Sequence, residues 1–112
     1  TLRFICLATV LLQPENLQPE TIIIDEPELG LHPLAISTFA GMVRSVSTSR
    51  QIIIATQSSD LLNEFSPENV IVADRQQNST TFKRLETAKL AEWLNEYSLG
   101  ELWHKNLIGG RP

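Results

Sequence analysis

The sequence predicts an α/β fold in which a parallel sheet is layered with helices. Residues 22–24 and residues 52–54 are both runs of isoleucine without polar alternation, and a helical pattern lies between them. Strands of this kind are typical of parallel sheets that are covered on both faces. A strand, a helix and a second strand form a βαβ unit, whose crossover is right-handed in nearly all cases. We therefore expect two parallel neighbouring strands that are buried on both faces.

Length, charge and cysteine content limit the possible classes. The 112 residues, 42% of them hydrophobic, are predicted to form one domain over residues 1–112 that buries roughly two thirds of its unfolded surface. A net charge of −4 gives no basic footprint, so nucleic-acid binding is not supported. Cys6 is the only cysteine, which excludes a disulfide within one chain and fits a cytoplasmic protein.

The chain opens with an apolar segment. Residues 2–12 are apolar except for Arg3 and Thr9. The segment is too short to span a bilayer and lacks the features of a signal peptide, so we expect no membrane partner. We predict a buried helix that ends near Gln13, because the residue before a proline resists helical dihedral angles. Since the chain begins with threonine, we also expect it to be part of a longer protein.

The central elements follow from spacing. A strand is predicted over residues 22–25, and Pro33 is well placed at the first position of a helix. Ser47-Thr48-Ser49 ends that helix, and the second strand covers residues 52–55. The apolar residues that recur at helical spacing, and that we expect to pack inward, are Ile36, Phe39, Ala40, Val43 and Val46.

The remaining residues predict shorter elements. Ser58 or Ser59 caps a short helix through Phe65, and residues 66–69 form a turn. Strands over residues 70–73 and 80–84 form an antiparallel hairpin, joined by a polar link over residues 74–79. Thr87 caps another helix, a short helix covers residues 99–107, and residues 109–112 are a frayed end. The aromatic residues expected in the core or at a docking surface are Trp93, Tyr97 and Trp103.

Polar residues follow both isoleucine strands. Asp25 and Glu26 follow the first, and Thr56-Gln57-Ser58 follows the second. In open α/β sheets the ligand crevice lies outside the carboxyl ends of the strands. Because successive strand residues point to opposite faces, the two acids are expected to have different tasks. We predict that Asp25 holds Mg²⁺ and that Glu26 accepts a proton from the attacking water, although these acids could also simply end a strand and begin a loop.

Three segments resemble a known family. Asp25-Glu26-Pro27-Glu28-Leu29-Gly30-Leu31-His32-Pro33 resembles the Walker B motif and D-loop of ABC-type ATPase heads, which are P-loop NTPases, in the branch of OLD-like and RecF-like predicted ATPases. The segment Ile52-Ile53-Ile54-Ala55-Thr56-Gln57-Ser58 is similar to the switch strand and loop of the same family. Residues 93–103 resemble the C-terminal tail of an uncharacterised group of such ATPases.

The resemblance implies a role for each matching position. Asp25 would take the Mg²⁺ role, and Glu26 would be the catalytic base. Gly30, Leu31 and His32 would form a loop at a dimer interface between heads, although transporter D-loops commonly have aspartate where His32 stands. Gln57 would be a catalytic switch residue in place of the histidine of many relatives, but glutamine cannot become cationic.

Two motifs of the family are missing from these residues. There is no Gly-x-x-x-x-Gly-Lys-Ser/Thr phosphate loop, and the signature motif would precede Thr1. The chain is therefore expected to be the C-terminal half of an ATPase head, inactive alone, whose partners are the N-terminal half of the same head and a second head in a homodimer. In the parent protein the cofactors would be ATP and Mg²⁺. The phosphate-loop strand of the family lies between the strands at residues 52–55 and 70–73, so we expect a gap in the sheet and marginal stability or self-association.

Two other functions remain open. The chain could be a non-catalytic interaction module that retains the ATPase fold. It could also belong to the nuclease-linked OLD-like branch, which needs an acidic metal-binding cluster downstream. The spacing of Cys6, His32 and His104 predicts no metal site other than that for Mg²⁺.

Overall fold

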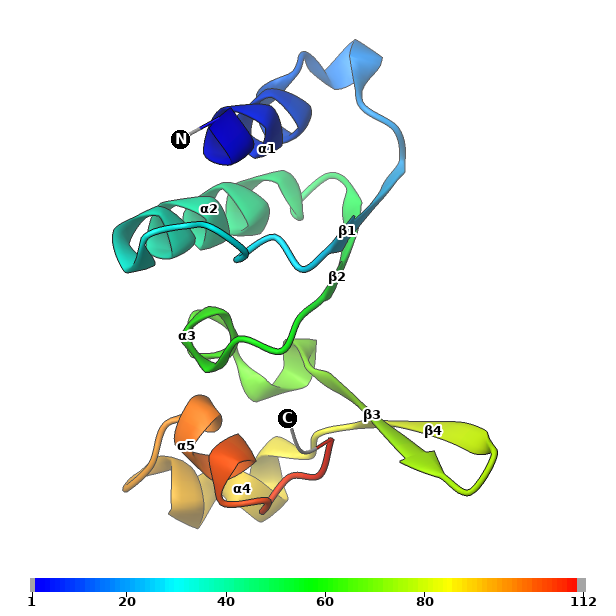
Figure 1. Ribbon diagram of the computed structural model, residues 1–112, viewed down its shortest axis with the longest axis vertical. Coiled ribbons are helices and arrows are strands. Elements are labelled where there is room, and N and C mark those ends of the chain that lie inside the picture. The colour runs from blue at the N-terminus through cyan, green and yellow to red at the C-terminus, as the bar shows by residue number, and fades with distance from the viewer. Residues whose placement is uncertain (1, 111–112) are drawn as a thin grey trace. The chain divides into compact units, whose positions relative to one another are not determined.

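The computed structural model describes residues 2–110, which form two units that meet in the chain between Gln57 and Ser58. The first unit, which ends at Gln57, is built around a parallel pair of strands (Figure 1). Its elements are helix α1 (Leu2–Leu12), a 3₁₀ turn (Glu15–Leu17), strand β1 (Thr21–Asp25), helix α2 (Pro33–Val46) and strand β2 (Gln51–Ala55). The order of strand, helix and strand is the predicted βαβ unit.

Strands β1 and β2 pair in parallel, as predicted. Ile22 is opposite Ile52 and Asp25 is opposite Ala55, so both strands end at the same level. The long connection between them contains α2, as a parallel pair requires.

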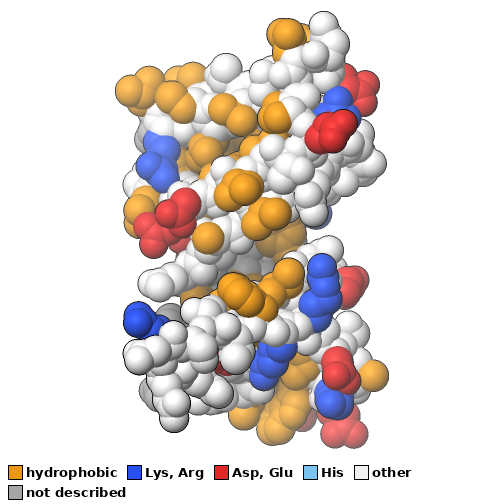
Figure 2. Space-filling view, turned by 90° about the vertical axis from the view of Figure 1, so that its right-hand side faces the viewer, with side chains coloured by type: hydrophobic (Ala, Val, Ile, Leu, Met, Phe, Trp, Pro, Cys, Tyr) orange, Lys and Arg blue, Asp and Glu red, His pale blue; other side chains and the backbone are white. Residues whose placement is uncertain are grey.

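The prediction that β1 and β2 are buried on both faces is wrong for the described residues. Ile22 and Ile24 are buried, whereas Ile23 is 72% exposed and Ile53 is 47% exposed. Side chains alternate along a strand, and α1 and α2 both lie on one side of the strand pair (Figure 1). Hydrophobic side chains reach the surface in Figure 2, which views the side of the molecule where β1 and β2 lie in Figure 1.

Helix α2 is amphipathic, as its spacing predicted. It buries Ile36, Phe39, Ala40 and Val43, while Val46 is half-buried. Its buried residues recur three or four positions apart and so lie on one face of the helix.

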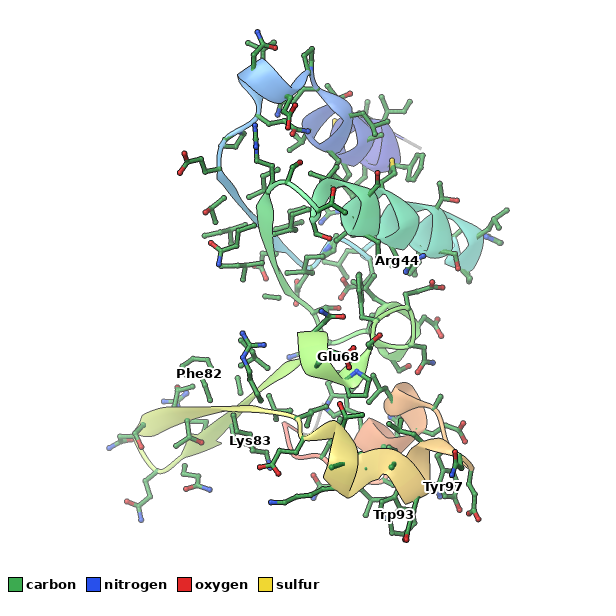
Figure 3. The ribbon with its side chains drawn as sticks, turned by 180° about the vertical axis from the view of Figure 1, so that it is seen from behind. Arg44, Glu68, Phe82, Lys83, Trp93 and Tyr97 are labelled. Atoms are coloured by element: carbon green, nitrogen blue, oxygen red, sulfur yellow. The ribbon has the colours of Figure 1, made fainter. Side chains whose placement is uncertain are left out.

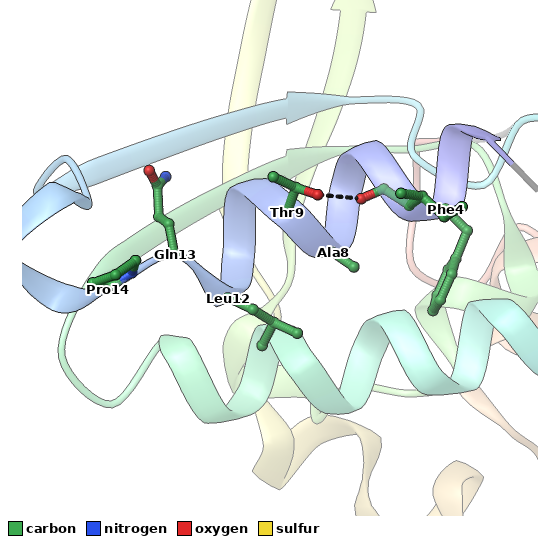
Figure 4. A pocket seen from close by; sticks show the side chains of 7 residues that line it. Phe4, Ala8, Thr9, Leu12, Gln13 and Pro14 are labelled. Carbon is green, nitrogen blue, oxygen red and sulfur yellow. Dashed lines mark hydrogen bonds between the residues drawn. The ribbon is translucent and has the colours of Figure 1, made fainter.

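Helix α1 has the predicted bounds but is not a buried helix. Only Leu11 of this helix is buried, and Leu2 is 77% exposed. Phe4 and Ala8 point towards α2 (Figure 4), so the side of α1 that faces away from α2 is uncovered by the described residues. None of the helices formed by residues 2–110 combines the length and apolar character that a membrane crossing requires.

The second unit begins at Ser58. Its elements are helix α3 (Ser59–Leu62), a 3₁₀ turn (Pro67–Asn69), strands β3 (Ile71–Gln76) and β4 (Ser79–Arg84), and helices α4 (Thr87–Leu94) and α5 (Leu99–His104). Strands β3 and β4 form a two-stranded sheet separate from that of β1 and β2.

The predicted antiparallel hairpin is confirmed, but its polar link is shorter than expected. Asp74 is opposite Thr81, and Gln76 is opposite Ser79, so much of the polar stretch belongs to the strands. Two residues make the turn, and Gln77 adopts a left-handed φ of 55°, as tight hairpins require. Phe82, 72% exposed, and Lys83 point to opposite sides of β4 (Figure 3).

Helices α4 and α5 contribute to a small core. The buried residues of this core are Leu90, Leu102, Trp103 and Ile108. Trp103 is thus a core aromatic, as predicted, whereas Trp93 is partly exposed and lies 6.1 Å from Tyr97 between ring centroids (Figure 3).

Capping differs from the prediction at α4. Thr87 is the first residue of α4 and does not cap it; the N-cap is Glu86, whose side chain makes no capping hydrogen bond. At α5, Ser98 and Glu101 form a capping box in which each side chain bonds the other's backbone N–H.

The segment after α5 does not fray at Gly109 and Gly110. The Gly110 N–H donates to Asp74 Oδ1 at 2.7 Å, and the Gly110 carbonyl accepts from the Trp103 indole. Both glycines have positive φ. A side chain on Gly110 would meet Val72 Cγ1 at 2.7 Å, so the position favours glycine for space as well as for dihedral angle. Arg111 and Pro112, the rest of the predicted frayed end, lie outside the described residues.

Candidate functional site

The predicted site residues follow the adjacent ends of β1 and β2. Asp25 ends β1 opposite Ala55, the last residue of β2. The Glu26 N–H donates to the Ala55 carbonyl at 2.8 Å, which extends the pairing by one residue. Gln57 is the second residue after β2. The prediction that the acids and the amide follow neighbouring parallel strands at one rim is therefore confirmed.

The two acids have different backbone settings. Asp25 is in regular strand conformation and exposed, on the same face as Ile23. Glu26 is half-buried and has a left-handed φ of 48°, which is uncommon for a residue with a side chain. The chain thus turns away from the strand direction at Glu26, so the two carboxyl groups do not simply alternate across the sheet.

Helix α1 is bonded to this rim through its first turn. Arg3 Nη2 donates to the Glu26 carbonyl at 2.8 Å. The two residues are 23 positions apart, and no spacing rule in the sequence signals the contact. Arg3 is a residue of the site that the sequence did not reveal.

The loop after Glu26 is ordered at both of its ends. Pro27 is fully buried, and Gly30 has a φ of 75°, which favours glycine. His32 is the N-cap of α2, and its Nδ1 accepts from the Leu34 N–H at 3.2 Å. Gly30 and His32 are exposed and Leu31 is half-buried, while their contact with a partner head stays a prediction.

Glu28 differs from the other acids of this loop. It is half-buried, and its Oε2 atom is shielded from solvent with no hydrogen-bond partner among the described residues. A buried oxygen without a hydrogen bond lowers the stability of the folded state. Glu28 is therefore a second energetically unfavourable position, two residues after Glu26.

In the predicted switch segment, Gln57 and Ser58 differ in exposure and in contacts. Gln57 is exposed. Ser58 is the N-cap of α3, and its Oγ accepts from the Leu61 N–H at 3.2 Å. The prediction of a cap at Ser58 or Ser59 is thus confirmed for Ser58, although the regular helix ends at Leu62 and not at Phe65.

The carboxylates here suit a cation that receives most of its ligands from elsewhere. Residues 2–110 contain no group of three or more His, Cys, Asp or Glu side chains that could hold a metal ion. Mg²⁺ is usually bound by one or two carboxylates together with phosphate oxygens and water. The exposed Asp25 carboxylate fits that kind of site, whereas it would not fit a cage built from protein ligands alone.

A hollow on the protein surface is unrelated to these residues. It is lined by residues of α1 and the segment after it, namely Phe4, Ile5, Ala8, Thr9, Leu12, Gln13 and Pro14 (Figure 4). Its lining is mostly apolar and includes no predicted site residue. The hollow is therefore no part of the predicted site.

Comparison with known proteins shows the family. Residues 1–63 match the family described as AAA domain, putative AbiEii toxin, Type IV TA system. The chain belongs to this AAA domain family. The matched residues extend from the start of the chain through α3 and include every predicted site residue, from Asp25 to Gln57.

The chain is also similar to an individual protein. It is 36% identical over 72 residues to the Old nuclease of Escherichia phage P2, a match that covers 63% of this chain and 12% of the nuclease. The chain therefore spans only a small part of that relative.

A solved structure shows the fold. It comes from a study entitled "Structural biochemistry of ATP-driven dimerization and DNA stimulated activation of SMC ATPases" and aligns with a TM-score of 0.64 at 16% identity, over 84% of this chain and 57% of that chain. The match fits a P-loop NTPase-like α/β fold for this chain, with the parallel pair and the hairpin described above.

Proposed function

We propose that this chain is the C-terminal half of an ABC-type ATPase head and takes part in ATP hydrolysis within a longer protein. The observation that carries the proposal is the common rim, where Asp25 and Glu26 follow β1 and Gln57 follows its parallel neighbour β2. Ligands of open α/β sheets bind at this end of the strands. Membership of the AAA domain family supports nucleotide as the ligand.

Each rim residue has a distinct chemical task in this proposal. Asp25 binds Mg²⁺, which would neutralise charge on the phosphates of ATP when bound. Glu26 accepts a proton from the water that attacks the γ-phosphorus, and Gln57 donates its amide N–H to a phosphate oxygen or orients that water. The remaining half of the head supplies the phosphate loop, and a second head meets the loop formed by Gly30, Leu31 and His32.

The decisive experiment measures ATP turnover by the longer protein with Glu26→Gln. Because the amide cannot accept the proton, we expect kcat to fall by about 10²–10⁴-fold while ATP still binds. Glu20→Gln is the matched control, since it removes the same charge just before the opposite end of β1, and it should leave kcat unchanged. Equal turnover by wild type and Glu26→Gln would refute the assignment of the base.

The alternative of an interaction module predicts a different pattern. A module of that kind would give no ATP turnover in the longer protein, with or without Glu26→Gln. The 112-residue chain alone should show negligible turnover under either proposal, because it has no phosphate loop.

Similarity to the Old nuclease favours one addition to the proposal. The identity of 36% over 72 residues supports a longer protein that also carries a nuclease centre outside this chain. Metal-dependent degradation of a DNA substrate by the longer protein tests this addition. Glu26→Gln should leave that centre intact, so nuclease activity in the absence of ATP should persist in the variant.

A further inference from the structure

We propose that Arg3 is a positioning residue for Glu26, holding the backbone of the general base in its left-handed conformation. The inference rests on the proposed function of Glu26 as that base. It assigns to the first turn of α1 a role in arranging the rim, although α1 itself contributes no side chain to the predicted chemistry.

Two hydrogen bonds from other elements fix the backbone groups of Glu26, in addition to the local bond that its carbonyl accepts from the Leu29 N–H at 3.4 Å. Its N–H donates to Ala55 on β2 at 2.8 Å, and its carbonyl accepts from Arg3 Nη2 on α1 at 2.8 Å. The second bond has a cationic donor, which makes it stronger than a bond between neutral groups. Glu26 is therefore held from two elements, one on each side of it in the chain.

The conformation of Glu26 explains why such support is needed. Among the described residues, the others with a side chain and a positive φ are Gln77 and Asn106. Gln77 lies in the tight turn of the hairpin, and Asn106 is the second residue after α5, which are positions where this conformation is ordinary. Glu26 instead directly follows a strand. A residue in this region persists when its surroundings hold it, and such residues concentrate at functional sites.

Loss of the Arg3 bond is expected to move the base. Without it, the Glu26 carbonyl has one fixed partner fewer, and the residue can relax towards the extended conformation that follows naturally from β1. A general base must lie within hydrogen-bond reach of the water it activates. A displacement of about 1 Å can cost on the order of 10²-fold in rate.

The first test compares kinetic constants of the longer protein. Arg3→Ala should lower kcat by roughly 10–100-fold with little change in KM for ATP, because the bond acts on the base and not on nucleotide binding. Arg3→Lys retains a cation and a donor, although without the planar fork of the guanidinium, and should recover part of the loss.

Arg50→Ala is the matched control. Arg50 Nη2 also donates to a backbone carbonyl at 2.8 Å, that of Glu15, in the same unit of the chain. It has no bond to Glu26. If removing any such arginine simply loosens the unit, Arg50→Ala and Arg3→Ala will lower kcat alike, and that result would overturn the inference.

The second test does not depend on activity. Amide hydrogen exchange of Glu26 reports the state of its N–H, and Arg3→Ala should speed this exchange by about 10-fold or more, with the amides within β2 unchanged. Unchanged Glu26 exchange in Arg3→Ala would overturn the inference even if kcat falls. If Arg3→Ala fails to fold, the same measurement on Arg3→Lys decides.

These results separate the inference from the proposed function. Loss of turnover in Glu26→Gln with wild-type turnover in Arg3→Ala would sink the role of Arg3 and leave the base assigned. Full turnover in Glu26→Gln would remove the catalytic reading of the rim and with it the positioning role of Arg3.

Discussion

His32 shows how a side chain in the predicted interface loop can also stabilise the fold. Its Nδ1 accepts from the Leu34 N–H, and Pro33 follows it at the first position of α2. Proline has no N–H to satisfy, so the cap bonds the next free donor of the helix. The resemblance implied that His32 lies in an interface loop and departs from the aspartate of transporter D-loops. Histidine and aspartate side chains can both accept this capping bond.

Substitutions at His32 separate the cap from any contact with a partner. His32→Ala should lower the free energy of unfolding by about 1 kcal/mol, because the first turn of α2 loses its acceptor. His32→Asp should retain most of that stability, since aspartate is a preferred N-cap. Urea unfolding followed by circular dichroism measures both. Stability of His32→Ala equal to that of the wild type would show that the cap contributes nothing.

At the scale of elements, Gly100 allows α5 to approach α3 closely. Its N–H donates to Asn63 Oδ1 at 2.7 Å. A Cβ at this position would lie 2.9 Å from Ser59 Cβ and 3.0 Å from the Ser59 carbonyl oxygen. These distances are below van der Waals contact, so the two helices cannot keep this separation with any larger residue.

Alanine at two helical glycines should therefore have opposite effects. Gly100→Ala should lower the free energy of unfolding by about 1–3 kcal/mol, because α3 and α5 must move apart. Gly41→Ala, in α2, should raise it by up to about 1 kcal/mol, since alanine favours the helix and the new Cβ would meet only Arg44 Nη2 at 3.8 Å. Thermal unfolding of both variants tests the pair. Stabilisation by Gly100→Ala would show that α3 and α5 do not pack as described.

Elements with a clear hydrophobic period could be predicted with nearly correct bounds, whereas the polar hairpin was predicted with a link that is too long. The preference of proline for the first helical position predicted the start of α2 at Pro33, and the spacing of apolar residues predicted its buried face. Strand β4 has no buried residue, so only pairing with β3 defines its length. The Ser98-x-x-Glu101 pattern in the sequence is a known capping signal and marks the start of α5.

The candidate site could also be predicted only in part. Strand order and parallel pairing place Asp25, Glu26 and Gln57 at one rim, and these follow from local sequence. The bond from Arg3 depends on where α1 packs in three dimensions, and the φ of Glu26 depends on the turn that follows β1. Neither has a signature in the spacing of residues.

At the scale of the whole molecule, the two isoleucine runs leave one face of β1 and β2 apolar and exposed. Ile23 and Ile53 are opposite each other in the register and both are largely exposed. A parallel sheet normally has both faces covered. The isoleucine runs, which lack polar alternation, are thus typical of strands with both faces packed against other elements. Residues 2–110 pack against one face only.

We expect the 112-residue chain to self-associate through this exposed surface as its concentration rises. The double variant Ile23→Thr with Ile53→Thr should shift the population towards monomer, because it reduces the apolar area that association would bury. Sedimentation velocity measures the shift. Leu17→Thr, at an exposed leucine in the 3₁₀ turn, is the control and should have a smaller effect. A wild-type chain that is monomeric at high concentration and melts cooperatively would contradict this expectation and the predicted marginal stability.

The location of the two tryptophans determines what an optical experiment on this chain can detect. Trp93, Trp103 and the single tyrosine all follow Ser58, so residues 1–57 contain no indole or phenol. Intrinsic fluorescence therefore reports on the second unit alone. The Trp103 indole donates to the Gly110 carbonyl, so its emission should change when this hydrogen bond is lost. A probe of the first unit by this method needs an added fluorophore, for which Phe39→Trp on the buried face of α2 is suitable.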